Sequence, residues 1–99
     1  MDLTQIRYLS PQIQQIARRH NISRLFVFGS VARGESTDHS DVDFLVEIQE
    51  NASLFDVAGF SYEIEKLLGL SVDVVPASLL PMVADQSFVN KIKEEAVLL

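Results

Sequence analysis

The chain has 99 residues, of which 47% are hydrophobic, and a formal net charge of −6. This length predicts one modest domain over residues 1–99. The absence of cysteine excludes disulfides and thiolate metal sites and fits a reducing cytoplasm. No apolar run approaches the ~20 residues of a membrane span, and the N-terminus lacks the pattern of a secretory signal. The acidic charge argues against direct nonspecific binding to nucleic acid.

The first part of the chain alternates between helical and strand patterns. From Leu3 to about His20, apolar residues recur at three- and four-residue steps, which predicts helix. Pro11 predicts that this helix either begins there or follows a short separate turn. Leu25–Phe28 is a short apolar run ended by glycine and predicts a buried strand. Ser30–Arg33 predicts a helical turn, and Gly34–Ser40 predicts a polar loop.

The second part continues the alternation. Asp43–Ile48 predicts a strand, Ser53–Gly69 a helix with a capping box at its start, Leu70–Val75 a third strand, and Asp85–Val97 a last helix. The side chains expected to face inward from these two helices are Leu54, Val57, Ala58, Ile64, Leu67 and Leu68 in the first, and Phe88, Ile92 and Ala96 in the second. The order of elements predicts an α/β domain with helices packed on a small sheet.

Three aspartates occupy strand positions where this residue is uncommon. Asp41 and Asp43 lie two positions apart at the start of the second strand, so both carboxylates point to one face. Asp73 interrupts the most apolar strand, where a buried aspartate is rare unless it is paired or bound to metal. If these strands are neighbours, the carboxylates converge, and a hard cation such as Mg²⁺ or Mn²⁺ would offset their repulsion. Two such ions would form the clamp used for in-line displacement at phosphorus.

Gly29 and Ser30 end the first strand and open a turn. A glycine there lets the backbone approach a ligand closely, the following N–H groups can hold a phosphate, and the serine hydroxyl adds a donor. The pair is also common punctuation between a strand and a turn, so alone it does not indicate a phosphate site. Arg33 either meets a phosphate from this turn or is a solvated loop residue.

The remaining charged residues are interpreted as structural. His20, beside two arginines near a helix end, provides a favourable C-terminal charge. Lys91, Lys93 and Glu94–Glu95 form an ordinary solvated helix face. The apolar end Val97–Leu99 is expected to pack on the core or on a partner. The chain offers no convincing nucleophile, so an attacking hydroxyl would come from the substrate.

With these residues the chain resembles the minimal nucleotidyltransferase (MNT) family of the DNA polymerase β-like superfamily. The family signature is Gly-Ser, ten residues, then Asp-x-Asp with a later third acid, here Gly29–Ser30, Asp41-Val42-Asp43 and Asp73, and Ser40 and Arg33-Gly34 also match. The resemblance implies a small mixed sheet of three strands in the order 1-2-3, flanked by helices. It implies that the three acids hold two Mg²⁺ ions and serve catalysis. It also implies that Gly29, Ser30, Arg33 and Ser40 bind the nucleotide.

The short stand-alone members of this family are antitoxins paired with HEPN-domain toxins, which are helical RNases. The resemblance therefore implies Mg²⁺-dependent transfer of AMP from ATP to a hydroxyl of such a toxin, with tyrosine as the acceptor. Two alternatives stay open: a non-catalytic antitoxin that blocks the toxin by binding, and a transferase for a small molecule of the aminoglycoside type. The intact acids weigh against the first alternative, and the missing substrate domain weighs against the second. Assembly with itself or with the toxin is left open.

Overall fold

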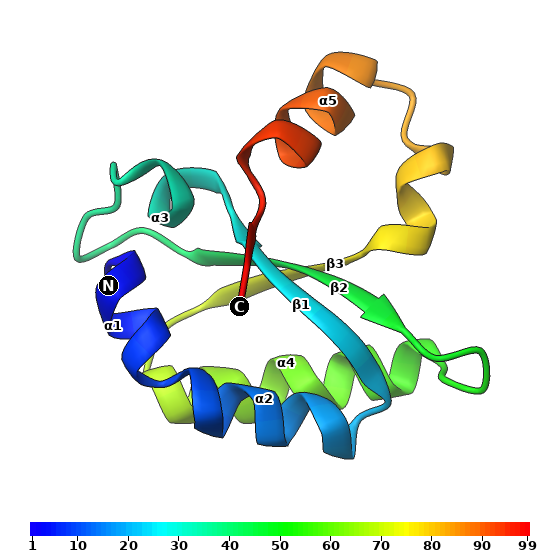
Figure 1. The fold of residues 1–99 in the computed structure, drawn as a ribbon, viewed down its shortest axis with the longest axis horizontal. Helices are drawn as coiled ribbons and strands as arrows, with labels where there is room; N and C mark the ends of the chain where they lie inside the picture. Colours follow the sequence, from blue (N-terminus) through cyan, green and yellow to red (C-terminus); the bar gives the residue numbers. More distant parts are fainter.

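A four-stranded sheet lies at the centre of the computed structural model, which describes residues 1–99 (Figure 1). Its strands are β1 (Ile22–Phe28), β2 (Val42–Ile48), β3 (Val72–Pro76) and β4 (Val97–Leu98). They lie in the order β3-β2-β1-β4, with β1 antiparallel to β2 and β4, and β2 parallel to β3. The mixed sheet and the adjacency of the first three strands are confirmed. The fourth strand corrects the prediction of three, because the chain end pairs with the free edge of β1.

Helices cover both faces of the sheet. They are α1 (Leu3–Tyr8), α2 (Ser10–Arg19), α3 (Gly29–Arg33), α4 (Leu54–Leu68), the 3₁₀ helix η1 (Ala77–Met82) and α5 (Gln86–Glu95). Helices α2 and α4 lie on one side of the sheet, and η1 and α5 lie on the other (Figure 1). None of these helices has the length and apolar character needed to cross a bilayer.

The helix boundaries follow local chemistry. The Asp2 side chain caps α1, and Pro11 stands in the first turn of α2. The main helix therefore begins at Ser10, as predicted from Pro11, and the predicted short separate turn before it is the helix α1. The predicted capping box of α4 forms between Ser53 and Asp56. Gly69 ends α4 in the left-handed conformation, with φ of 69°.

Two hydrophobic clusters hold the layers together. Fifteen buried residues lie between the sheet and α1, α2, α3 and α4, and among them the rings of Phe44 and Phe60 meet edge to face at 6.0 Å. Five buried residues lie on the opposite face and attach η1 and α5: Phe28, Leu45, Leu80, Val89 and Ile92. The acids of the sequence motif lie on the face that this smaller cluster covers only in part.

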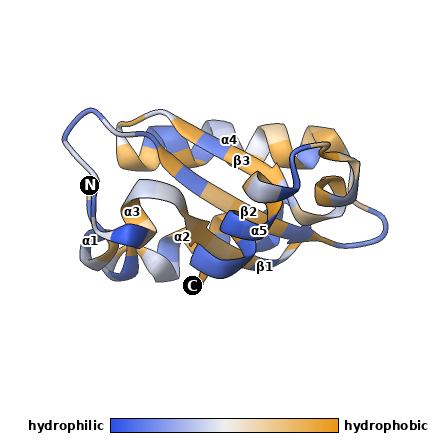
Figure 2. Cartoon of the chain, turned by 90° about the horizontal axis from the view of Figure 1, so that it is seen from above, coloured by the Kyte–Doolittle hydropathy of each residue, from blue (hydrophilic) through white to orange (hydrophobic).

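The predicted inward faces of α4 and α5 are partly wrong. Leu54 is 66% exposed and Ala58 is exposed, whereas Phe60 is fully buried. In α5, Val89 and Ile92 are buried and Phe88 is 46% exposed. The small cluster under α5 needs only a narrow apolar stripe, and most of this helix is hydrophilic (Figure 2). Helix α5 also ends two residues earlier than predicted, which releases the chain to form β4.

His20 does more than supply a helix-end charge. It hydrogen-bonds with Glu63 of α4, and Arg19 donates a second bond to the same carboxylate at 2.7 Å. These two hydrogen bonds lower the pKa of Glu63 below its ordinary value. The group therefore ties the end of α2 to the middle of α4.

Candidate active site

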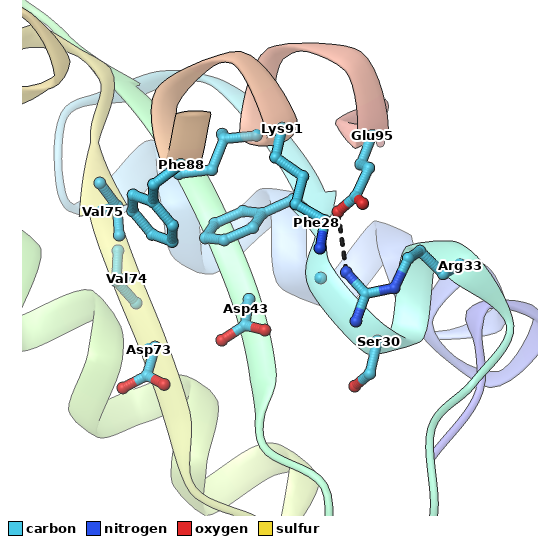
Figure 3. A pocket seen from close by; sticks show the side chains of 12 residues that line it. Phe28, Ser30, Arg33, Asp43, Asp73, Val74, Val75, Phe88, Lys91 and Glu95 are labelled. Atoms are coloured by element: carbon cyan, nitrogen blue, oxygen red, sulfur yellow. Dashed lines mark hydrogen bonds and ion pairs between the residues drawn. The ribbon is translucent and has the colours of Figure 1, made fainter. Parts of the chain in front are cut away.

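Two of the three predicted acids lie side by side on the open face of the sheet. Asp43 of β2 and Asp73 of β3 are partners in the parallel register, so their side chains leave the same face. Figure 3 shows both carboxylates beside one pocket. The expectation that Asp73 is buried is wrong: it is exposed, because β3 is an edge strand of the sheet.

Asp41 precedes β2 by one residue and is exposed. It acts on the same site, because its charge is one of the causes that raise the pKa of Asp43. The three carboxylates do not form one cluster in which all three could bind the same metal ion. The structure therefore shows a pair, Asp43 and Asp73, with the third acid alongside.

Gly29 makes the close approach of Asp43 possible. Phe28 and Asp43 are partners in the antiparallel β1–β2 pairing, which brings the next residue, Gly29, against that side chain. A Cβ atom at Gly29 would lie 2.2 Å from Oδ2 of Asp43, and its φ of +75° is one that other residues rarely adopt. Both the contact and the backbone conformation thus require glycine here.

A pocket of about 570 Å³ opens beside these acids. Its lining includes Gly29, Ser30 and Arg33 from α3, Asp43 and Asp73 from the sheet, and Phe88, Lys91 and Glu95 from α5. Two sequence candidates, Asp41 and Ser40, are not part of the lining. The Ser40 hydroxyl instead accepts a hydrogen bond from the Thr37 N–H at 2.9 Å, inside the loop that leads to Asp41.

Arg33 links two walls of the pocket. Its Nε donates to Glu35 at 2.9 Å, and its Nη1 donates to Glu95 of α5 at 2.9 Å. These hydrogen bonds, to Glu35 first and then to Glu95, raise the pKa of the guanidinium further above its ordinary value. The ion pair with Glu95 holds α3 against α5 (Figure 3).

The contribution of α5 was not predicted from sequence. Lys91 and Glu95, interpreted as part of a solvated helix face, line the pocket together with Phe88. Their spacing could have indicated this, because residues 88, 91 and 95 lie on one face of a helix, so all three would line a ligand site if Phe88 did. This face lies beside the apolar one that attaches α5 to the sheet.

The electrostatics of the acid pair favour a bound cation. The pKa of Asp43 is raised from 3.8 to about 6, first by burial, then by the neighbouring carboxylate of Asp73 and the charge of Asp41. Arg33 opposes the shift only weakly as the last of these causes. An all-carboxylate donor set without histidine or cysteine is the set that Mg²⁺ and Mn²⁺ prefer. The residues present therefore fit a hard divalent cation.

We expect the free energy of unfolding of the metal-free protein to fall as pH rises through about 6, the folded-state pKa of Asp43. This pKa lies above the ordinary value of 3.8, so Asp43 gives up its proton more easily in the unfolded chain than in the folded one. The contribution of protonated Asp43 to stability is therefore fully present below about pH 4 and is lost as pH rises through about 6. The difference between the folded-state pKa and the ordinary pKa of Asp43 corresponds to about 3 kcal/mol of unfolding free energy. Solvent screening of this half-buried group reduces the expected effect to about 1 kcal/mol.

Asp43→Asn should remove this part of the pH dependence, and denaturant unfolding at pH 4 and pH 7 measures it. Asp38→Asn, in the exposed loop before the motif, is the matched control and should keep the wild-type profile. An unchanged profile in Asp43→Asn would contradict the raised pKa.

Comparison with known proteins places the chain in a family. Residues 9–99 match the family described as "Nucleotidyltransferase domain". A Methanocaldococcus jannaschii protein, provisionally named a protein adenylyltransferase, is 39% identical over 82 residues, which cover 82% of this chain and 88% of that protein. The protein adenylyltransferase MntA of Thermococcus cleftensis is 39% identical over 72 residues, which cover 73% of each chain.

Solved structures agree with this assignment. A structure provisionally described as a minimal nucleotidyltransferase matches with a TM-score of 0.81 and 36% identity, covering 100% of this chain and 97% of that one. A complex of the tri-AMPylated Shewanella oneidensis HEPN toxin with its MNT antitoxin contains a chain that matches with a TM-score of 0.64. At 14% identity, over 93% of this chain and 69% of that one, this likeness concerns the fold alone. The sequence motif, the fold and these matches together show that the chain belongs to the nucleotidyltransferase family.

Proposed function

We propose that this nucleotidyltransferase is a metal-dependent protein adenylyltransferase that neutralises a HEPN-type toxin as its antitoxin. The observation that carries the proposal is the Asp43–Asp73 pair, which strand register brings together in the lining of a pocket, with Asp43 against Gly29. The relatives named protein adenylyltransferase and the complex of an AMPylated HEPN toxin with an MNT antitoxin support it.

Asp41, Asp43 and Asp73 are the residues that would hold two Mg²⁺ or Mn²⁺ ions. When bound, these ions would stabilise the charge that develops on the transferred phosphoryl group and on the oxygens that attack it and leave it. Burial first, and then the like charges of Asp73 and Asp41, raise the pKa of Asp43 in the metal-free protein. A bound cation would offset the repulsion between these carboxylates.

The proposed transfer is an in-line displacement at the α-phosphorus of ATP. The acceptor oxygen forms a bond to this phosphorus, the bond to the oxygen that bridges to the β-phosphate breaks, and pyrophosphate leaves. Asp73, exposed at the edge of the sheet, is proposed to take the proton of the acceptor hydroxyl. Its exposure leaves room for a hydroxyl that is delivered by another molecule.

Gly29 and Ser30 are proposed to hold the β- and γ-phosphates, since both line the pocket and the serine hydroxyl adds a donor without charge. Arg33 is proposed as a further nucleotide contact from the same wall. For Ser40, which lies outside the lining, we propose a positioning role in place of direct contact. Its hydrogen bond with Thr37 shapes the loop before Asp41.

The proposed acceptor is a tyrosine hydroxyl of the toxin. A protein of net charge −6 associates faster with a partner of opposite charge, and a protein that binds RNA offers basic surface. This steering should weaken as salt rises. The acidic character of the chain thus suits a basic protein partner better than it suits nucleic acid.

The proposal predicts that a HEPN-type protein is encoded beside the chain, and coexpression of the two tests it. We expect relief of the growth arrest caused by the partner, and mass addition of adenylate at a tyrosine of that partner in the presence of ATP and Mg²⁺. Rescue without any adenylate on the partner would favour inhibition by binding alone. Adenylate found on an added aminoglycoside, and none on the protein, would favour the small-molecule transferase.

A further inference from the structure

The wall of the pocket that α5 forms carries a lysine, Lys91, that is in no ion pair. Arg33 on the opposite wall is already shared between Glu35 and Glu95, at 2.9 Å from each. Lys91 lines the same pocket and takes part in none of the ion pairs of the structure. Figure 3 shows its side chain running from α5 into the pocket, towards the side where Arg33 lies. Its ammonium is therefore the charge that is free to meet an anionic ligand.

The pocket also has two chemically different ends. Val75 and the half-exposed ring of Phe88 form an apolar end over β3. Ser30 and Arg33 form a polar end over α3. The volume of about 570 Å³ lies within the usual range of ~300–1,000 Å³ for small-molecule sites. A nucleoside triphosphate has the same division, with a flat apolar base at one end and an anionic chain at the other.

We propose that α5 orients the nucleotide, with the Lys91 ammonium on the β- and γ-phosphates and the Phe88 ring against the base. The inference rests on the proposed function only in taking a nucleoside triphosphate as the substrate. The role of Lys91 follows from the charges of the pocket, because Arg33 is shared between Glu35 and Glu95 and the Lys91 ammonium is in no ion pair. The face of Phe88 gives a base a stacking surface that tolerates any purine or pyrimidine.

Binding of ATP and of AMP to the intact chain, measured by calorimetry in the presence of Mg²⁺, separates the two contacts. Lys91→Ala should weaken ATP binding about 10-fold and leave AMP binding within about twofold, because AMP lacks the outer phosphates. Phe88→Ala should weaken ATP and AMP by the same factor, because both carry the base. Lys91→Arg should keep most of the ATP affinity, because it keeps the charge.

Lys93→Ala is the matched control, since Lys93 lies on the same helix and outside this pocket. It removes the same charge and should change ATP binding less than twofold. Equal weakening by Lys91→Ala and Lys93→Ala would reduce the effect to overall charge and overturn the assignment. Equal loss of ATP and AMP in Lys91→Ala would also overturn it, as would a wild-type chain that binds no ATP.

The outcomes distinguish this inference from the proposed function. Suppose that the wild-type chain binds ATP, that Lys91→Ala weakens this binding and Lys93→Ala does not, and that no partner protein is adenylated. This result would refute the proposed function and leave the proposed orientation of the nucleotide intact. A chain that adenylates its partner, while Lys91→Ala binds ATP as tightly as the wild type does, would refute the role of Lys91 alone.

Discussion

Replacing Asp41 and Asp43 together with asparagine should slow adenylyl transfer by about 10³-fold or more, which corresponds to roughly 4 kcal/mol of transition-state stabilisation. Folding should survive, because neither side chain is part of the two hydrophobic clusters and the substitution removes like-charge repulsion. The initial rate at which labelled adenylate appears on the partner measures the first effect. Thermal unfolding of the metal-free protein measures the second.

Asp38→Asn again serves as the control, since it lies three residues before Asp41 in the exposed loop and outside the pocket. It should transfer adenylate at nearly the wild-type rate. A double variant that is folded and transfers adenylate as fast as this control would show that the two acids are not the catalytic centre.

Gly29→Ala should impair both the fold and the site. The added Cβ would lie 2.2 Å from Oδ2 of Asp43, and the residue would keep a φ of +75°. We expect a loss of about 1–3 kcal/mol in the free energy of unfolding, from strain and from displacement of Asp43. Transfer should fall by about 10²-fold, because a shift of about 1 Å in a reacting group has effects of that size.

Gly34→Ala provides an unusually close control for Gly29→Ala. Gly34 has the same φ of +75°, and a Cβ there meets nothing within 4 Å. It should therefore show the backbone strain alone, with a smaller loss of stability and nearly unchanged transfer. Denaturant unfolding and transfer rates of the two variants, compared side by side, isolate the contact with Asp43. Equal transfer rates in both would mean that this contact does not matter for the reaction.

Most of the elements could be predicted because their signals are local. The capping box at Ser53, the stop at Gly69 and the apolar run before Gly29 each fix a boundary through residues that are adjacent in sequence. The three aspartates could also be identified locally, because aspartate is uncommon in β-strands and each of them lies in or beside an apolar strand segment. Their pairing then follows from the parallel register of β2 and β3.

The errors concern contacts between distant segments. The strand Val97–Leu98 has only two residues, too few for a pattern, and it exists because the edge of β1 accepts it. The inward face of α5 depends on how little of the sheet this helix covers, which periodicity does not reveal. Lys91 became a candidate only when the fold placed it opposite Arg33, since a charged helix residue is usually solvated.

The register of β2 and β3 also determines which parts of the gene can change in length. Asp43 meets Asp73 because residues 42–46 pair one for one with residues 72–76. Gain or loss of one residue within either segment would bring a valine beside Asp43 and turn the third acid to the opposite face. The loop at residues 49–53 lies outside both this paired segment and the acid motif, and it leaves the alignment untouched when its length varies. Insertions and deletions among related genes should therefore accumulate in this loop and avoid the two paired strands.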